Sequence, residues 1–351
     1  MVVVEEARYS AIDLFSGCGG LTAGLKAAGF RVLAAIEIDR LAADTYALNH
    51  PEVRIWRTDI RALSTEEVMD ELGLQEGDLD LLAGCPPCQG FSRLRTLNGS
   101  RTIPDPRNRL IRDFLRFVVG MLPKAVMFEN VPGLLRRTEF HRFHRDLEQL
   151  GYAADYREVD AAAYGVPQRR ERVILLAARA ARIPYPDPLT VRRTVRDAIG
   201  CLPRPGDSGD EVHDLPENRT SRTRRLIGSI PKDGGSMSDL GREARLPCHK
   251  RCRGFSDVYG RMAWDAVAPT ITTGCVNPSK GRFLHPQEDR CVTLREAALL
   301  QSFSRGYRFQ LCRGKFPAAA LIGNAFPPEL AKWHAAAVAR FLKESSAFRD
   351  A

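Results

Sequence analysis

The first 180 residues alternate short runs rich in β-branched residues with amphipathic stretches that repeat at the helical period. Strands are predicted at residues 11–15, 31–37, 79–83, 125–129, 156–160 and 172–178. Helices are predicted between them at residues 21–28, 41–49, 65–72, 111–122 and 140–150, the third with a Ser64 and Glu67 capping box. This alternation is typical of a mostly parallel sheet with helices on both faces, in which ligands bind beyond the carboxyl ends of the strands. We therefore expect the chemistry in the loops that follow the strands.

The alternation stops near residue 183. From there to about residue 292 the sequence is rich in Pro, Gly, Arg and Ser and has few periodic segments, which indicates a second, irregular domain. Helical periodicity returns at residues 293–301 and 329–342. A length of 351 residues agrees with two domains at roughly 150 residues each.

The sequence predicts a protein that stays in the cytoplasm. No apolar run approaches the roughly 18 residues that a membrane span needs, and residues 1–6 do not have the pattern of a signal peptide. The nine cysteines are odd in number and irregularly spaced, so reduced thiols are expected rather than a disulfide framework.

Positive charge is concentrated in one part of the second domain. The chain carries a net charge of +9, and residues 219–253 hold ten basic residues against three acidic ones. Such a window is suited to contact with phosphates, as in nucleic-acid binding. A solvated loop region whose charges happen to segregate is the alternative, and charge alone does not decide between the two.

The loop after the first predicted strand is rich in glycine. It reads Asp-Leu-Phe-Ser-Gly-Cys-Gly-Gly over residues 13–20, a tight turn that opens a helix and leaves backbone N–H groups free for a polar cofactor. Glu37 ends the second strand 20 residues after Gly17, where nucleotide-binding folds place an acid for the ribose, and Asp59 is a candidate for the adenine edge. These residues fit an adenosine-containing cofactor, although a tight turn without a ligand stays open.

The loop after the third predicted strand contains Cys85 and Cys88 and leaves two interpretations open. The two cysteines form a redox or metal pair, or one of them is a lone nucleophile at the end of a strand. Zinc is disfavoured because the other close pair, Cys248 and Cys252, has poor spacing for a zinc site, and we expect no metal. The following stretch, residues 91–108, is long for such a loop and is typical of a lid or binding loop.

An acid and an arginine pair follow later strands. Glu129 ends the fourth predicted strand, and Arg170 and Arg172 lie at the entry to the last. If the sheet brings them to the cysteine loop, they form an acid and nucleophile constellation. The alternatives are a simple pair between Glu129 and Arg170, and an edge position for Arg172.

Taken together, these loops resemble the bacterial-type DNA (cytosine-5) methyltransferases, essentially from end to end of the chain. The matching segments, in the family's order, are residues 13–20, 87–89, 129–131, 168–172, 295–303 and 323–327. Three residues depart from the family pattern: Cys85 replaces a usual glycine, Ser304 a frequent proline and Phe326 a common valine. None of them is a group that the reaction needs.

The resemblance implies a Rossmann-like α/β fold of the class I methyltransferase type with a smaller, irregular target-recognition domain. Residues 1–182 with 317–351 would form the catalytic domain, and residues 183–316, with a core at 183–292, would recognise DNA. The last helix would then fold back onto the catalytic domain.

The implied activity is sequence-specific methylation of cytosine C5 in double-stranded DNA, in a restriction-modification or related defence system. The methyl donor would be S-adenosylmethionine, and the target nucleotide would be flipped out of the duplex. Cys88 would add to C6, Glu129 would hydrogen-bond N3 and the exocyclic amine, and Arg170 and Arg172 would hold O2 and a phosphate. These four are the predicted catalytic residues. The resemblance also implies a monomer of the bacterial cytoplasm or nucleoid, without an obligatory protein partner.

The resemblance also implies two sets of binding residues. Those for the cofactor are Asp13, Phe15, Ser16, Gly17, Gly19, Gly20, Leu21, Glu37, Ile38, Asp59, Ile60, Gly84, Pro86, Asn324 and Ala325. Those for DNA are Gln89, Ser92, Arg93, Arg95, Arg222, Arg224, Arg225 and Lys250.

Three other functions share part of this pattern. A tRNA cytosine-5 methyltransferase would have the same catalytic motifs, but a recognition region of more than 100 residues favours duplex DNA. A catalytically silent DNA-binding relative would have a broken nucleophile or acid, whereas Cys88 and Glu129 are intact. A NAD-dependent enzyme would explain the glycine loop and leave the cysteine, acid and arginine loops without a role.

Overall fold

The computed structural model describes residues 9–87, 110–179, 181–241 and 257–347. The chain divides into two compact units. Unit 1 consists of Met1–Asp160, Glu171–Pro188 and Phe326–Ala351, and unit 2 of Ala161–Arg170 and Leu189–Ala325. These boundaries differ from the expected ones, because residues 161–170 and 317–325 pack with the second unit and residues 183–188 with the first.

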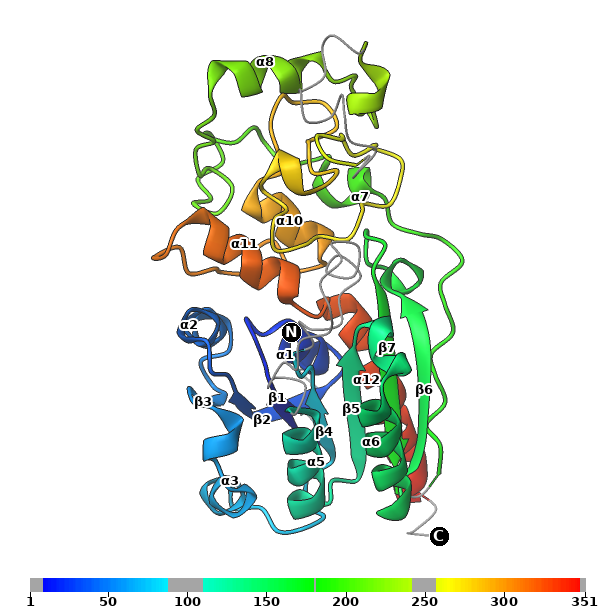
Figure 1. Ribbon diagram of the computed structural model, residues 1–351. Helices are drawn as coiled ribbons and strands as arrows, with labels where there is room; N and C mark the ends of the chain where they lie inside the picture. The colour runs from blue at the N-terminus through cyan, green and yellow to red at the C-terminus, as the bar shows by residue number, and fades with distance from the viewer. Residues whose placement is uncertain (1–8, 88–109, 180, 242–256, 348–351) are drawn as a thin grey trace, which may run out of the picture. The chain divides into compact units, whose positions relative to one another are not determined.

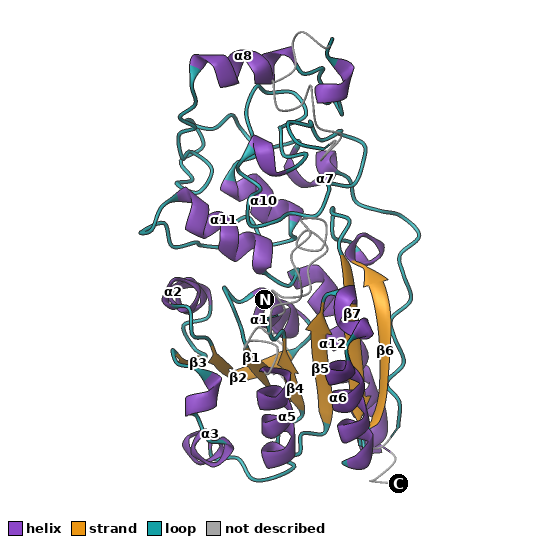
Figure 2. Ribbon diagram, viewed as in Figure 1, coloured by secondary structure: helices purple, strands orange, loops and turns teal. Residues whose placement is uncertain are grey.

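Unit 1 is built on a seven-stranded sheet of order β3-β2-β1-β4-β5-β7-β6 (Figures 1 and 2). The strands are β1 (Tyr9–Leu14), β2 (Phe30–Ile36), β3 (Arg54–Trp56), β4 (Leu81–Gly84), β5 (Ala125–Asn130), β6 (Ala153–Asp160) and β7 (Glu171–Ala178). The first five in spatial order are parallel, while β7 runs antiparallel to both β5 and β6. The predicted mostly parallel sheet is confirmed, and the sequence missed only the three-residue β3 among these strands.

Helices cover both faces of this sheet (Figure 1). They are α1 (Gly20–Ala27), α2 (Arg40–Asn49), α3 (Thr65–Leu72), α5 (Leu110–Met121), α6 (Thr138–Gln149) and α12 (Pro328–Ala347). The predicted capping box is present at the start of α3. On one face, Phe114 of α5 and Phe143 of α6 pack edge to face with ring centroids 5.8 Å apart, within an apolar cluster that includes Phe128 of β5.

The last helix packs against α1, as expected. A Cβ atom added to Gly24 in the middle of α1 would lie 2.4 Å from Ala331 Cβ and 2.5 Å from the Pro328 carbonyl oxygen. The absence of a side chain at Gly24 therefore lets α12 approach the backbone of α1. This contact returns the end of the chain to unit 1.

Unit 2 is mostly irregular, as its composition predicts (Figure 2). Its helices include α7 (Val195–Ile199), α8 (Ser221–Ser229), α10 (Leu294–Leu300) and α11 (Lys315–Asn324). Arg261 is fully buried and donates hydrogen bonds to the carbonyl oxygens of Ile227, Ile230 and His285. The guanidinium group of Arg261 thus joins these segments of unit 2 to one another.

No helix in the described ranges is both long and apolar enough to cross a membrane.

Candidate active site and cofactor pocket

The glycine turn begins at the carboxyl end of β1 and leads into α1. Phe15 has φ 60° and Gly17 has φ 56°, so the backbone enters the left-handed region at both positions. A left-handed φ is uncommon for an aromatic residue, and strain of this kind clusters at ligand sites. The turn leaves the first N–H groups of α1 available to a ligand.

Glu37, just beyond the end of β2, is fixed against this turn. Its two carboxylate oxygens accept hydrogen bonds from the Gly17 N–H at 2.8 Å and the Asp39 N–H at 2.7 Å. Burial raises the pKa of Glu37 above its usual value. The next residue, Ile38, is 65% exposed, so an apolar side chain stands uncovered beside the predicted ribose ligand.

Asp13 lies under the turn and is fully buried. Its Oδ2 accepts a hydrogen bond from Thr22 Oγ1 at 2.7 Å, and the Tyr46 hydroxyl lies 2.8 Å from the same Thr22 oxygen. Its Oδ1 and the Ser16 Oγ are buried and have no hydrogen-bond partner in the described part of the chain. Burial raises the pKa of Asp13 to about 7. Buried polar atoms are rarely left unpaired, so these two indicate where a polar ligand would bind.

The remaining unit 1 residues predicted for the cofactor differ in their surroundings. Leu21 and Ile60 are buried in the structure. The Asp59 carboxylate accepts hydrogen bonds from Arg61 Nε at 2.9 and 3.1 Å, and this pairing lowers the pKa of Asp59. The predicted contact of Asp59 with adenine stays a prediction, and its carboxylate would be shared with Arg61.

The cysteine loop starts where β4 ends at Gly84. A side chain at Gly84 would collide with the Leu14 carbonyl oxygen, 2.6 Å from the added Cβ, so glycine lets the loop leave the sheet beside β1. Cys85 follows directly. Burial first, and then the carboxylates of Glu129 and Asp13, raise the pKa of the Cys85 thiol well above its usual range. Cys85 is therefore a thiol and a poor nucleophile at neutral pH.

Glu129 is buried near the end of β5 and pairs with Arg172 at the start of β7. Arg172 Nε lies 2.7 Å from Glu129 Oε1, and the side chains of Arg172 and Glu129 are 13% and 11% exposed. The antiparallel direction of β7 explains the pair, because it brings the beginning of β7 beside the carboxyl end of β5. The alternative pairing of Glu129 with Arg170 is not observed.

Asn130, the last residue of β5, connects the acid to the cysteine loop. Its Nδ2 donates a hydrogen bond to the Pro86 carbonyl oxygen at 3.0 Å. Asn130 is not among the residues predicted for the site, although the motif at residues 129–131 contains it. A polar residue at a buried strand end, next to an acid, is the signal that could have identified it.

Arg170 has different surroundings from Arg172. It belongs to unit 2 and is buried, and its guanidinium donates to the carbonyl oxygens of Ile271, Gly323 and Ala325. Asn324 and Ala325 also belong to unit 2, where Asn324 is exposed and Ala325 is buried. The two arginines of one motif therefore have separate partners.

The basic window divides into free and paired side chains. On α8, Arg222, Arg224 and Arg225 are exposed and have no ion pair among the described residues. By contrast, Arg219 pairs with Glu217 and donates to the Val276 carbonyl oxygen at 2.9 Å, so it belongs to the unit's framework. The predicted residues Cys88, Gln89, Ser92, Arg93, Arg95 and Lys250 lie outside the described residues.

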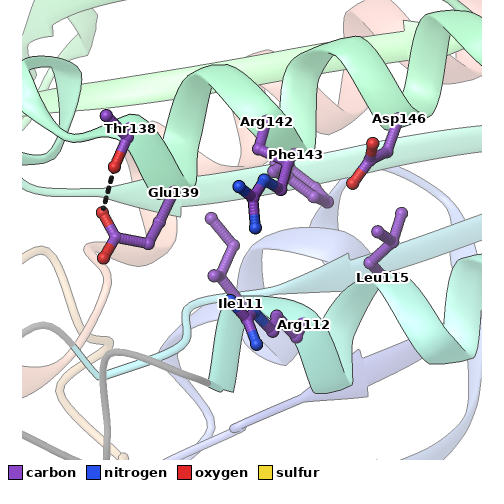
Figure 3. A pocket seen from close by; sticks show the side chains of 8 residues that line it. All are labelled: Ile111, Arg112, Leu115, Thr138, Glu139, Arg142, Phe143 and Asp146. Atoms are coloured by element: carbon purple, nitrogen blue, oxygen red, sulfur yellow. Dashed lines mark hydrogen bonds between the residues drawn. The ribbon is translucent and has the colours of Figure 1, made fainter.

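A separate hollow of about 200 Å³ lies between α5 and α6 (Figure 3). Two arginines, Arg112 and Arg142, share it with the carboxylates of Glu139 and Asp146. These charges balance, and none of the predicted site residues lines the hollow. We assign it no part in the chemistry.

Comparison with known proteins identifies the family. The sequence model described as C-5 cytosine-specific DNA methylase matches residues 9–340. The chain belongs to this family. It is therefore a DNA (cytosine-5) methyltransferase, and the expected family and enzyme class are confirmed.

Relatives of this methyltransferase match nearly its whole length. The Type II methylase M.HgiDII of Herpetosiphon aurantiacus is 38% identical over 349 residues, covering 95% of each chain. The Type II methyltransferase M1.HphI of Haemophilus parahaemolyticus is 32% identical, covering 93% of this chain and 86% of the relative. A structure described as a prophage-encoded DNA modification methyltransferase of E. coli has a TM-score of 0.70 at 26% identity, covering 95% of this chain and 99% of the other. The class I methyltransferase fold is thereby confirmed.

Proposed function

We propose that this methyltransferase modifies cytosine within a specific duplex DNA sequence, through a covalent bond between Cys88 and C6 of a flipped-out base. The Type II methyltransferases similar to it support a role in a restriction-modification system. The observation that carries the proposal is the largely buried Glu129–Arg172 pair. The next residue, Asn130, donates a hydrogen bond to the Pro86 carbonyl oxygen, just before the nucleophile motif. An acid and a paired cation next to the start of the cysteine loop support the proposal that the base is bound here.

In the proposed reaction, Cys88 adds to C6 as a thiolate and so makes C5 electron-rich. Glu129 hydrogen-bonds N3 and the exocyclic amine and stabilises the charge that builds on the ring. Arg172 orients Glu129 and reaches O2 of the pyrimidine. Once C5 carries the new methyl group, loss of its proton and elimination of the Cys88 thiolate from C6 restore the aromatic ring and the free enzyme.

The methyl donor implied by the family is S-adenosylmethionine, which supplies an electrophilic methyl group when bound. The residues around the end of β1 fit this molecule on three observations. Ser16 Oγ and Asp13 Oδ1 lack partners among the described residues, Glu37 is held at the position suited to a ribose, and Ile38 offers an apolar surface for adenine. The residues that would hold the donor are therefore those of the glycine turn, Glu37 and Ile38. Asn324 and Ala325 are proposed as cofactor residues on the family resemblance alone.

We further propose unit 2 as the DNA-recognition domain, with phosphate contacts from α8. The exposed arginines of α8 and the irregular backbone around them support this assignment. Gln89, Ser92, Arg93, Arg95 and Lys250 are proposed DNA contacts on the family resemblance alone. The enzyme is proposed to work as a monomer in the cytoplasm.

Sequencing of methylated cytosines in DNA from cells that express the enzyme tests this function. Methylation at one short recurring sequence is expected, and it should vanish with Glu129→Gln. In vitro methyl transfer to duplex DNA and to tRNA distinguishes the two substrates. Transfer to tRNA alone would overturn the proposal.

A further inference from the structure

Arg170 holds a turn in unit 2 from both of its sides. Its Nη2 donates to the carbonyl oxygens of Gly323 at 3.0 Å and Ala325 at 3.1 Å, the two neighbours of Asn324. Its Nη1 donates to the Ile271 carbonyl oxygen at 3.1 Å. Both hydrogens of Nη2 are thus used on either side of one residue.

Two glutamines hold the same turn from a second direction. Gln301 Nε2 donates to the Ile322 carbonyl oxygen at 2.6 Å, and its Oε1 accepts from Gln168 Nε2 at 2.7 Å. Gln168 Oε1 in turn accepts from the Ile271 N–H at 2.6 Å. The glutamines and Arg170 therefore form one buried network around residues 322–325.

Close packing also fixes the turn. A Cβ atom added to Gly323 would lie 2.3 Å from the Thr272 carbonyl carbon and 2.4 Å from the Thr273 nitrogen. Gly323 and Ala325 are buried, whereas Asn324 between them is exposed. The surroundings fix the backbone of Asn324, and its exposed amide makes no hydrogen bond to another residue in the described part of the chain.

We propose that Arg170 is a positioning residue that acts through Asn324, and that it does not contact the substrate base or a phosphate. By fixing the carbonyl groups on both sides of Asn324, it holds the amide in the orientation that binds the cofactor. Its role then differs from that of Arg172, which serves the acid. The inference rests on the proposed cofactor role of Asn324.

The test is a double-mutant cycle on binding of S-adenosylhomocysteine, the demethylated product, measured by calorimetry. Arg170→Met is expected to weaken binding about tenfold, and Asn324→Ala at least as much. The double variant should bind no more weakly than Asn324→Ala, because residues that act as a unit are not additive. Affinity for duplex DNA should stay within about twofold of wild type, since phosphate contacts are what would change it.

Arg261→Met is the matched control. Arg261 is another buried arginine of unit 2 that donates to backbone carbonyl oxygens, but those carbonyls lie elsewhere. Its loss should lower thermal stability and leave product affinity unchanged. If Arg170→Met does not fold, Gln301→Met replaces it and should show the same non-additivity with Asn324→Ala.

Three results would overturn the inference. These are unchanged product affinity in Arg170→Met, independent effects in the double variant, or a loss of DNA affinity without a loss of product affinity. Failure of the wild-type enzyme to bind the product at all would instead contradict the proposed function.

Discussion

Arg172 and Glu129 form a largely buried ion pair, with 2.7 Å between Arg172 Nε and Glu129 Oε1, across the antiparallel strands β5 and β7. Each partner depends on the other, because a charge left alone in such surroundings is strongly destabilising. The Glu129 carboxylate is therefore held in one orientation without a ligand. Preorganised groups of this kind are effective because they need no rearrangement during the reaction.

Replacing either partner of the Glu129–Arg172 pair should have a measurable effect, on the free energy of unfolding or on the rate of methyl transfer. Arg172→Met leaves Glu129 unpaired, so we expect a loss of about 3 kcal/mol in the free energy of unfolding, measured by urea denaturation. Glu129→Gln leaves the Arg172 charge beside a neutral acceptor, so it should also lower stability, and it should slow single-turnover methyl transfer by roughly 10²- to 10³-fold. Arg169→Met, an exposed arginine of the same motif, is the control and should change neither quantity. Wild-type stability in Arg172→Met would show that the Glu129–Arg172 pair does not stabilise the fold.

Asp13 should make the ligand-free enzyme less stable as pH rises. Its pKa is about 7 in the fold and near 3.8 when exposed, because burial disfavours the charged form. The folded state therefore binds the proton more tightly, and this stabilisation is complete below pH 4 and is lost as pH approaches 7. Glu37 shifts in the same direction, so the comparison with Asp13→Asn isolates Asp13.

The measurement is the thermal midpoint between pH 5 and pH 8. Wild type should lose more stability over this range than Asp13→Asn. Thr22→Val removes a hydrogen bond that lowers the pKa of Asp13, so its loss of stability should continue to higher pH. Parallel pH curves for wild type and Asp13→Asn would contradict the assignment.

The arginines of α8 should contribute to DNA binding through phosphates. Changing Arg222, Arg224 or Arg225 to Gln should weaken binding to all sequences alike and reduce the slope of log K against log salt by about 0.9 for each contact. The control is Arg340→Gln on α12, an exposed helical arginine outside unit 2. If all three variants keep the same salt dependence as the control, the arginines of α8 do not contact phosphates and belong to a solvated surface.

The contact between α1 and α12 predicts an unusual response to a small substitution. Gly→Ala inside an exposed helix normally stabilises by about 1 kcal/mol. Gly24→Ala should instead destabilise by about 2 kcal/mol in urea, since its Cβ would overlap Ala331 and the Pro328 carbonyl. Gly306→Ala, with open space around the added atom, should stay within about 0.5 kcal/mol. A stabilised Gly24→Ala variant would place α12 elsewhere.

Much of the fold was predictable because its signals are local. The strands that become β1, β2 and β5 are apolar runs, and Ser64 with Glu67 marks the start of α3 within four residues of sequence. The three-residue β3 is too short to show a period. The helix α11 was missed because its sequence is almost entirely apolar and shows no alternation of polar and apolar faces. Even its exposed position 316 is a phenylalanine.

The sequence indicates the residue types of the candidate site but not how they pair. Sequence spacing cannot tell which of Arg170 and Arg172 meets Glu129, because the answer depends on where β7 begins and which way it runs. Nor can sequence show that Arg219 is used within unit 2 while Arg224 stays exposed. Contacts between residues far apart in the chain decide both.

The central claim is that Cys88, and not Cys85, attacks the base. Cys85 has a pKa raised by burial and by nearby carboxylates, so it should be unreactive even though it lies three residues away. Duplex DNA with 5-fluorocytosine at the target should be trapped covalently after methyl transfer, because fluorine cannot leave as a proton does. Cys85→Ala should still form the adduct on a denaturing gel, Cys88→Ala should form none, and peptide mapping should locate the bond at Cys88. An adduct on Cys85, or trapping that survives the loss of Cys88, would contradict the account.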